Sequence, residues 1–178
     1  MKTAFITIIS ISVVIFLVIA ITGRMTKTVV VSRTFNAPLE TVWTRWNDTE
    51  SIKQYWGPKN YTAPKIENDF REGGSFLFAM RSPSGETFYN AGKYTQIIPK
   101  EKIAATLSFA DENGNLIPGS EVKAPGHWPD AVNVTVTFKD VGGKTEVTVQ
   151  EDGIPALMYI LAKMGWQQQM DKFELLVK

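Results

Sequence analysis

Hydrophobic and polar positions follow three different patterns along the chain. Residues 4–22 are uncharged and mostly apolar, and residues 27–150 contain short stretches in which apolar and polar side chains alternate. In the last part of the chain the apolar residues recur at helical spacing: Trp166, Met170, Phe173 and Val177. Alternation of apolar and polar residues predicts strands with one covered face. Apolar residues that recur about every 3.6 residues predict an amphipathic helix. We therefore expect an apolar segment, then an antiparallel sheet, then a long helix.

The alternating stretches predict about six to seven strands. The clearest hairpin has Val132, Val134, Val136 and Phe138 on one face before the Gly142-Gly143 turn, with Val147 and Val149 after it. The other predicted strands are Lys27–Phe35, Thr62–Phe70, Ser75–Arg81, Thr87–Ile97 and Lys102–Phe109. Polar residues outside and apolar residues inside indicate a sheet whose inner face is covered.

Two short helices are predicted after the first strand. Pro38 suits the first turn of a helix, and Asn47-Asp48-Thr49 separates this helix from a second one, which ends at Tyr55 before Gly57-Pro58. The order of strand, two short helices, strands and long helix predicts an α+β fold of two layers. In that fold the C-terminal helix covers one face of the sheet.

The apolar N-terminal segment is long enough to cross a bilayer. Ala4–Thr22 carries no charge and, at about 1.5 Å per residue, spans close to the ~30 Å hydrocarbon core. We expect an anchor rather than a cleaved signal peptide, because a signal peptide has an apolar run of only ~7–15 residues. The candidate cleavage triplet Ala20-Ile21-Thr22 also ends in threonine. We therefore divide the chain into a transmembrane anchor, 1–23, and a domain, 24–178.

The charges around this segment favour one orientation. Lys2 precedes it, and Arg24, Lys27 and Arg33 follow it. Positive charges tend to remain on the cytoplasmic side of a membrane. We therefore expect a single-pass protein whose domain lies in the cytoplasm.

Composition excludes several classes of function. Of 19 basic and 18 acidic residues, only Lys2 lies within residues 1–23, so the remaining domain is formally neutral and lacks the basic surface of a nucleic-acid binder. The chain has no cysteine, and its single histidine, His127, has no second histidine with which to form a transition-metal site. No nucleophile elbow, phosphate-binding loop or zinc-protease motif is present. We expect no metal, no cofactor and no catalytic residue that a motif identifies.

Several short motifs together resemble one known family. They are Arg33-Thr34-Phe35-Asn36-Ala37-Pro38 with Val42-Trp43, Tyr55-Trp56-Gly57-Pro58, Phe70–Phe76, Gly92-Lys93-Tyr94, and Gly165–Gln168 with Asp171-Lys172. In this order residues 27–178 resemble the bacterial homologues of the activator of heat shock protein 90 ATPase. That family belongs to the SRPBCC or START-like superfamily, whose birch-pollen-allergen-like fold is called the helix-grip fold. The apolar N-terminal segment is a departure from the family.

The resemblance implies a curved antiparallel sheet around the C-terminal helix, with an apolar cavity between them. Relatives in the superfamily bind lipids, hormones or polyketides in such a cavity, and some are cyclases or hydrolases. We therefore expect a membrane-tethered domain that binds a hydrophobic small molecule or lipid. Two alternatives stay open: an interaction module of the chaperone-ATPase-activator type, and a cyclase- or hydrolase-type enzyme, which we consider less favoured.

Large apolar side chains at predicted inward positions and in the loop around His127 are the candidates for the cavity wall. They are Phe76, Phe78, Met80, Tyr94, Phe109, Trp128, Phe138, Trp166, Met170 and Phe173. Ligand cavities are mostly apolar. The other interpretation is ordinary core packing, which every two-layer domain requires.

Overall fold

The computed structural model describes residues 25–178, and these residues form one seven-stranded antiparallel sheet with helices on its concave face. The strands are β1 (Thr26–Phe35), β2 (Ile66–Asn68), β3 (Ser75–Arg81), β4 (Thr87–Ile98), β5 (Lys102–Ala110), β6 (Val132–Asp140) and β7 (Thr145–Pro155). Their order across the sheet is β1-β7-β6-β5-β4-β3-β2. Apart from β1 and β7, strands that pair in the sheet are also consecutive in the sequence.

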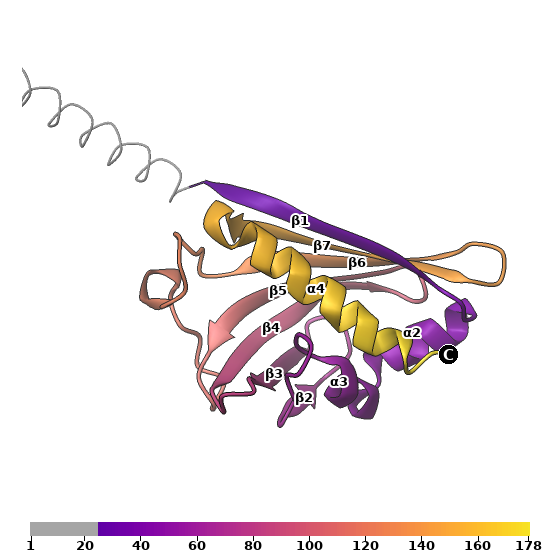
Figure 1. Cartoon of the computed structure of the whole chain (residues 1–178), viewed down its shortest axis with the longest axis horizontal. Helices are drawn as coiled ribbons and strands as arrows, with labels where there is room; N and C mark the ends of the chain where they lie inside the picture. The colour runs from indigo at the N-terminus through magenta and orange to yellow at the C-terminus, as the bar shows by residue number, and fades with distance from the viewer. Residues whose placement is uncertain (1–24) are drawn as a thin grey trace, which may run out of the picture.

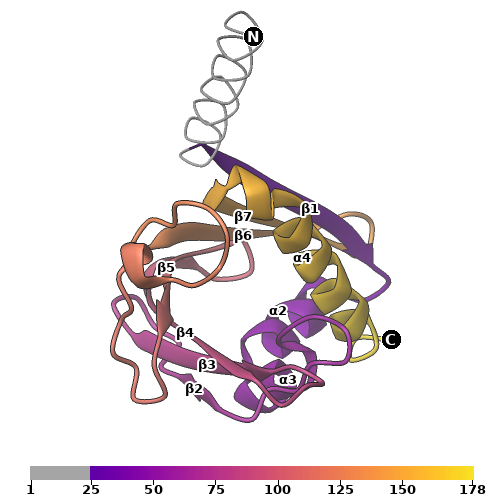
Figure 2. The same ribbon diagram turned by 60° about the vertical axis from the view of Figure 1, so that its left-hand side comes forward.

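Three α-helices lie on the inner side of the sheet. They are α2 (Leu39–Asn47), α3 (Thr49–Tyr55) and α4 (Tyr159–Glu174), and two short 3-10 turns, η1 (Gly119–Glu121) and η2 (Ala156–Met158), precede β6 and α4. α4 runs along β1 and β7, as Figure 1 shows. The sheet curves from β1 round to β2, with α2 and α3 between its far end and α4 (Figure 2). This arrangement confirms the α+β prediction and is consistent with a helix-grip fold.

The core is densest where α4 meets the two short helices. Phe173 of α4 is fully buried, and its ring lies 5.0–5.1 Å from those of Phe35, Trp46 and Tyr55. Edge-to-face rings at this separation attract one another beyond the gain from burial alone. The aromatic rings around Phe173 therefore pack closely against one another at this end of the fold.

Local chemistry explains where the short helices begin and end. Asp48 caps α3, because its carboxylate accepts hydrogen bonds from the Ser51 amide and hydroxyl, each 2.8 Å long. Gly57, just after α3, has a φ of +85°, which favours glycine and stops the helix. Pro38 occupies the N-cap of α2 and not its first turn, a shift of one position from the sequence prediction.

One predicted strand is much shorter than expected. The stretch Thr62–Phe70 forms a strand only over Ile66–Asn68, with an isolated bridge between Thr62 and Arg81. Pro64 lacks the amide hydrogen that a continuous ladder needs, so pairing is interrupted there.

The predicted anchor cannot be compared with the fold. Residues 4–22 lie outside the described part of the chain. Among residues 25–178, no helix has the length and apolar character needed to cross a bilayer.

Candidate functional site

The described domain has a cavity of about 290 Å³ between the sheet and the first half of α4. Twenty residues line it, and most are apolar: Trp56, Gly57, Pro58, Met80, Asn90, Leu107, Ser108, Phe109, Ala124, Trp128, Pro129, Val132, Glu151, Ile154, Met158, Leu161, Ala162, Gly165, Trp166 and Gln169. They come from the sheet, from η2 and α4, and from two loops, one after α3 and one before β6. A cavity of this size lies near the lower end of the range for small-molecule sites.

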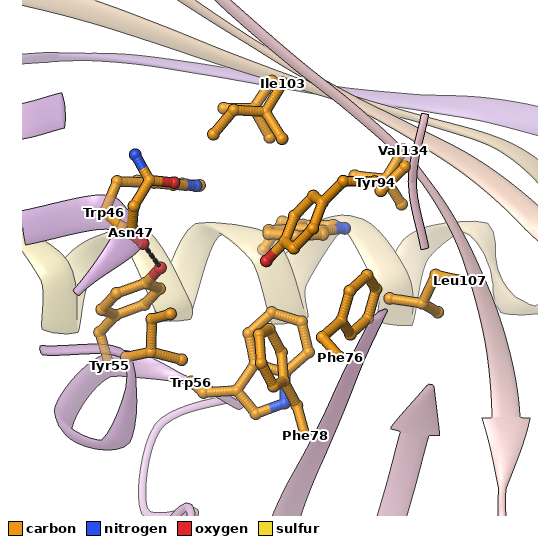
Figure 3. Close-up of a pocket in the computed structure, with 14 residues that line it drawn as sticks. Trp46, Asn47, Tyr55, Trp56, Phe76, Phe78, Tyr94, Ile103, Leu107 and Val134 are labelled. Atoms are coloured by element: carbon orange, nitrogen blue, oxygen red, sulfur yellow. Dashed lines mark hydrogen bonds between the residues drawn. The ribbon is translucent and has the colours of Figure 1, made fainter. Parts of the chain in front are cut away.

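A smaller cavity of about 70 Å³ adjoins the first one. Trp56, Leu107 and Trp166 line both spaces, so these three side chains lie between them. The rings of Trp56, Phe78, Phe76 and Tyr94 contact one another in series at centroid distances of 4.8–5.2 Å. Figure 3 shows these rings around the smaller space, beside the hydrogen bond from the Tyr55 hydroxyl to the backbone of Trp46.

The loop that follows α3 is held firmly against α4. Gln169 Oε1 accepts a 2.8 Å hydrogen bond from the Gly57 amide, and Gln168 Oε1 accepts one of 3.0 Å from the Lys59 amide. Lys172 Nζ donates to the carbonyl oxygens of Trp56, Gly57 and Tyr61 at 3.0–3.2 Å. Burial lowers the pKa of the Lys172 ammonium group. These contacts fix one wall of the larger cavity.

The loop before β6 forms the opposite wall. Asp130 accepts a 2.8 Å hydrogen bond from the amide of Gly119, which closes this loop on itself. Trp128 from the loop packs edge-to-face on Phe109 of β5, with ring centroids 5.0 Å apart. His127, the neighbouring residue, is exposed and does not line either cavity.

Glu151 introduces a carboxyl group into this apolar wall. It lies on β7, its side chain faces inward, and only 8% of the residue is exposed. The Trp166 indole nitrogen donates a 2.8 Å hydrogen bond to Glu151 Oε2. Burial raises the pKa of the Glu151 carboxyl group above its ordinary value, while the hydrogen bond from Trp166 acts in the opposite direction.

Sequence analysis did not name Glu151, although a signal for it was present. Val147 and Val149 are inward on β7, and the same alternation places the next inward side chain at position 151. An acidic residue that continues an apolar row is unusual, because burial of an unpaired charge is costly. This break in the row was the available indication of a functional position.

Other polar groups of the cavity wall lack partners. Within residues 25–178, no acceptor lies within hydrogen-bonding distance of three buried donors: Trp56 Nε1, Trp128 Nε1 and Gln169 Nε2. Buried donors without a partner are rare in folded proteins. All three belong to residues that line the larger cavity.

The structure separates the ten predicted site residues into three groups. Four line the larger cavity: Met80, Phe109, Trp128 and Trp166. Three others line the smaller one: Phe76, Phe78 and Tyr94. The last three pack in the core and line neither space: Phe138, Met170 and Phe173.

Comparison with known proteins gives a family and a set of similar folds. The family model described as Activator of Hsp90 ATPase homolog 1-like protein matches residues 36–178. No curated protein gives a significant match.

Solved structures from several bacteria resemble the fold. A protein of Chromobacterium violaceum has a TM-score of 0.70 at 24% identity, over 84% of this chain and 96% of that one. The AHSA1 protein of Silicibacter pomeroyi has a TM-score of 0.69 at 16% identity, over the same shares of the two chains. A protein of Staphylococcus epidermidis has a TM-score of 0.66 at 22% identity, over 86% and 91%. At these identities the likeness concerns the fold alone.

Proposed function

The chain belongs to the Activator of Hsp90 ATPase homolog 1-like family, and from this membership and the cavity we propose that it binds a hydrophobic small molecule or lipid. The observation that carries the proposal is the apolar space of about 290 Å³ between the sheet and α4. Water gains few hydrogen bonds in a space lined by apolar side chains, so an apolar ligand displaces it favourably.

Native mass spectrometry of the full-length protein, released from detergent, tests this proposal. We expect a bound species of defined mass and displacement of an apolar fluorescent dye by a lipid extract. Ala162→Phe places a ring in the cavity and should weaken dye binding at least tenfold. Gln167→Phe, at an exposed position of the same helix, should leave it unchanged. A ligand-free spectrum together with no dye displacement would exclude the proposed function.

We further propose that residues 4–22 tether the domain to a membrane and that the start of α4 faces the lipid surface. Four large apolar side chains around η2 and the start of α4 are 45–61% exposed: Leu157, Ile160, Leu161 and Met164. Met25 lies beside them, because its carbonyl oxygen accepts a 2.8 Å hydrogen bond from the Ala156 amide. The apolar segment therefore enters the domain next to this exposed patch, and the starts of β1 and α4 lie together in Figure 1. An exposed apolar patch at such a position suits contact with lipid.

The absence of cysteine makes this second proposal easy to test. A fluorophore on Leu161→Cys in nanodiscs should be quenched by doxyl-labelled lipid. One on Val141→Cys, in the turn after β6, should not. Equal quenching at both positions would contradict lipid contact at α4. Release of the full-length protein from membranes by alkaline carbonate would contradict the tether itself.

Glu151 supports an enzyme as a second candidate function. A buried carboxyl group with a raised pKa, inside a cavity, is suited to general acid–base catalysis. Hydrolysis of 4-nitrophenyl decanoate by the full-length protein, lost in Glu151→Gln, would support this candidate. Turnover no faster than in buffer would argue against a hydrolase. The chaperone-activator alternative is supported by the family's description alone, and a pull-down with an Hsp90-type chaperone tests it.

A further inference from the structure

The larger cavity has an electrostatic preference that its apolar walls do not reveal. Among its twenty lining residues, all in the described domain, Glu151 is the only ionisable one, and no lysine, arginine or histidine lines the space. A carboxylate ligand would find no basic partner in this wall, and Glu151 in its ionised form would also repel it. The wall therefore opposes a ligand that carries a carboxylate.

The carboxyl group of Glu151 keeps one oxygen free for a ligand. Its Oε2 accepts the hydrogen bond from Trp166, and within residues 25–178 no protein group bonds to Oε1. An ionised carboxyl oxygen is an acceptor, and a protonated carboxyl group is also a donor. Because burial favours the protonated form, a ligand hydroxyl can pair with Oε1 in either state.

A free donor lies on the same face of α4. Gln169 is one helical turn beyond Trp166, and residues at this spacing are neighbours on a helix surface. Its Oε1 is occupied by the Gly57 amide, which identifies Nε2 as the end of the amide that lacks a partner. Only 6% of the residue is exposed. The cavity wall therefore offers a free acceptor, Glu151 Oε1, and a free donor, Gln169 Nε2, besides the indole nitrogens of Trp56 and Trp128.

These features point to one class of ligand. We propose that the larger cavity takes an uncharged apolar molecule with a hydroxyl group, and that Glu151 excludes carboxylates of the same size. A hydroxyl both donates and accepts, so it can donate to Glu151 Oε1 or accept from Gln169 Nε2. This inference rests on the proposed binding function and specifies the chemistry of the ligand.

The test compares 1-decanol with decanoate, which share a chain of equal length. Binding to the full-length protein in detergent is followed by tryptophan fluorescence, since Trp56, Trp128 and Trp166 line the cavity. We expect 1-decanol to bind at least tenfold more tightly than decanoate to the wild-type protein. At alkaline pH, which favours the ionised form of Glu151, that ratio should fall at least fivefold in Glu151→Gln, because the repulsion is removed and the shape is kept. Both probes partition into the same micelles with every variant, so the change in the ratio reports on the protein.

Glu146→Gln is the matched control. It removes the same charge from β7, but Glu146 alternates with the inward Val147 and does not line the cavity. We expect this variant to keep the wild-type ratio. Binding of both probes with the same ratio in wild type and Glu151→Gln would overturn the inference and leave the binding function standing. Binding of neither probe, with no apolar dye bound, would reject both.

Discussion

At the scale of single residues, two positions show how a side chain, or its absence, shapes the space inside the sheet. Glu151 continues the inward row of Val147 and Val149 and brings a carboxyl group into the cavity wall. Gly92 of β4 has the opposite role, because a Cβ at this position would overlap the Thr106 carbonyl oxygen and the Phe76 ring. The first residue brings a carboxyl group into the cavity wall, and the second lets the Phe76 ring lie close to the strand.

Glu151→Gln should stabilise the fold more strongly at neutral than at acidic pH. Burial raises the pKa of this carboxyl group in the folded protein, so the contribution of Glu151 to stability is greatest below the ordinary glutamate pKa of about 4.3. Part of that stability is lost as the pH rises through the folded pKa, whereas the glutamine variant has no proton to lose. Urea unfolding of the full-length protein in detergent, at about pH 4 and about pH 8, measures the difference. A pH-independent difference between the two proteins would contradict it, and Glu146→Gln is the control.

Two glycine substitutions should have opposite signs. Gly92→Ala forces both the Phe76 ring and the pairing of β4 with β5 to move and should cost about 1–3 kcal/mol. Gly165→Ala, inside α4, meets only Pro58 at an ordinary 3.8 Å and should stabilise by about 0.5–1 kcal/mol. Chemical unfolding measures both effects, and equal effects of the two substitutions would refute the role given to Gly92.

At the scale of elements, the cavity depends on α4 holding a loop that is remote in sequence. Gln168, Gln169 and Lys172 contact the loop 56–61 through five hydrogen bonds. The loop thereby becomes a wall of the cavity instead of a free connection after α3. The motifs Tyr55–Pro58 and Gly165–Lys172, which carry much of the family resemblance, are two halves of one contact.

Lys172→Met should loosen this contact. It leaves three carbonyl oxygens without their donor and should cost about 1–3 kcal/mol of stability. Hydrogen exchange of residues 56–61 should quicken at the same time, since their amides depend on the same packing.

Lys163→Met provides the comparison. Lys163 lies on α4, and within residues 25–178 it shares no hydrogen bond with this loop. Lys163→Met should change neither the stability nor the hydrogen exchange of residues 56–61. Similar effects of Lys163→Met and Lys172→Met would mean that loss of a positive charge alone was responsible.

At the scale of the whole molecule, the two ends of α4 have different roles. At one end Phe173 packs against the short helices. The first half of the helix borders the larger cavity and, with η2, carries the exposed patch of Leu157, Ile160, Leu161 and Met164. The apolar segment 4–22 precedes β1, which begins beside this patch. Tether, patch and cavity therefore lie at one end of the domain in the proposed arrangement.

The orientation of the domain can be checked directly. The charges around residues 4–22 favour a cytoplasmic domain. A membrane-impermeant maleimide should therefore leave Val141→Cys unmodified in intact cells and modify it after lysis. Modification in intact cells would place the domain on the outer side.

The hydrophobic pattern, together with the proline, glycine and asparagine signals that bound the two short helices, determined the kinds of element and their order. Burial of one face requires an apolar residue at every second position in a strand and about every 3.6 positions in a helix. β6, β7 and α4 could therefore be recognised from their own sequences, without knowledge of the elements that pack against them. The length of β2 was predicted wrongly, because Pro64 shortens the strand by interrupting its pairing with β3, and this pairing is not visible in the pattern of one strand.

Only the tertiary structure decided which inward side chains border open space. Phe173 and Trp166 share one face of α4, yet the first fills the core and the second lines both cavities. Periodicity tells which way a side chain points, but the space in front of it depends on what the opposite element supplies. The bond between Glu151 and Trp166, and the contact of Gly57 with Gln169, join residues that the chain alone does not bring together.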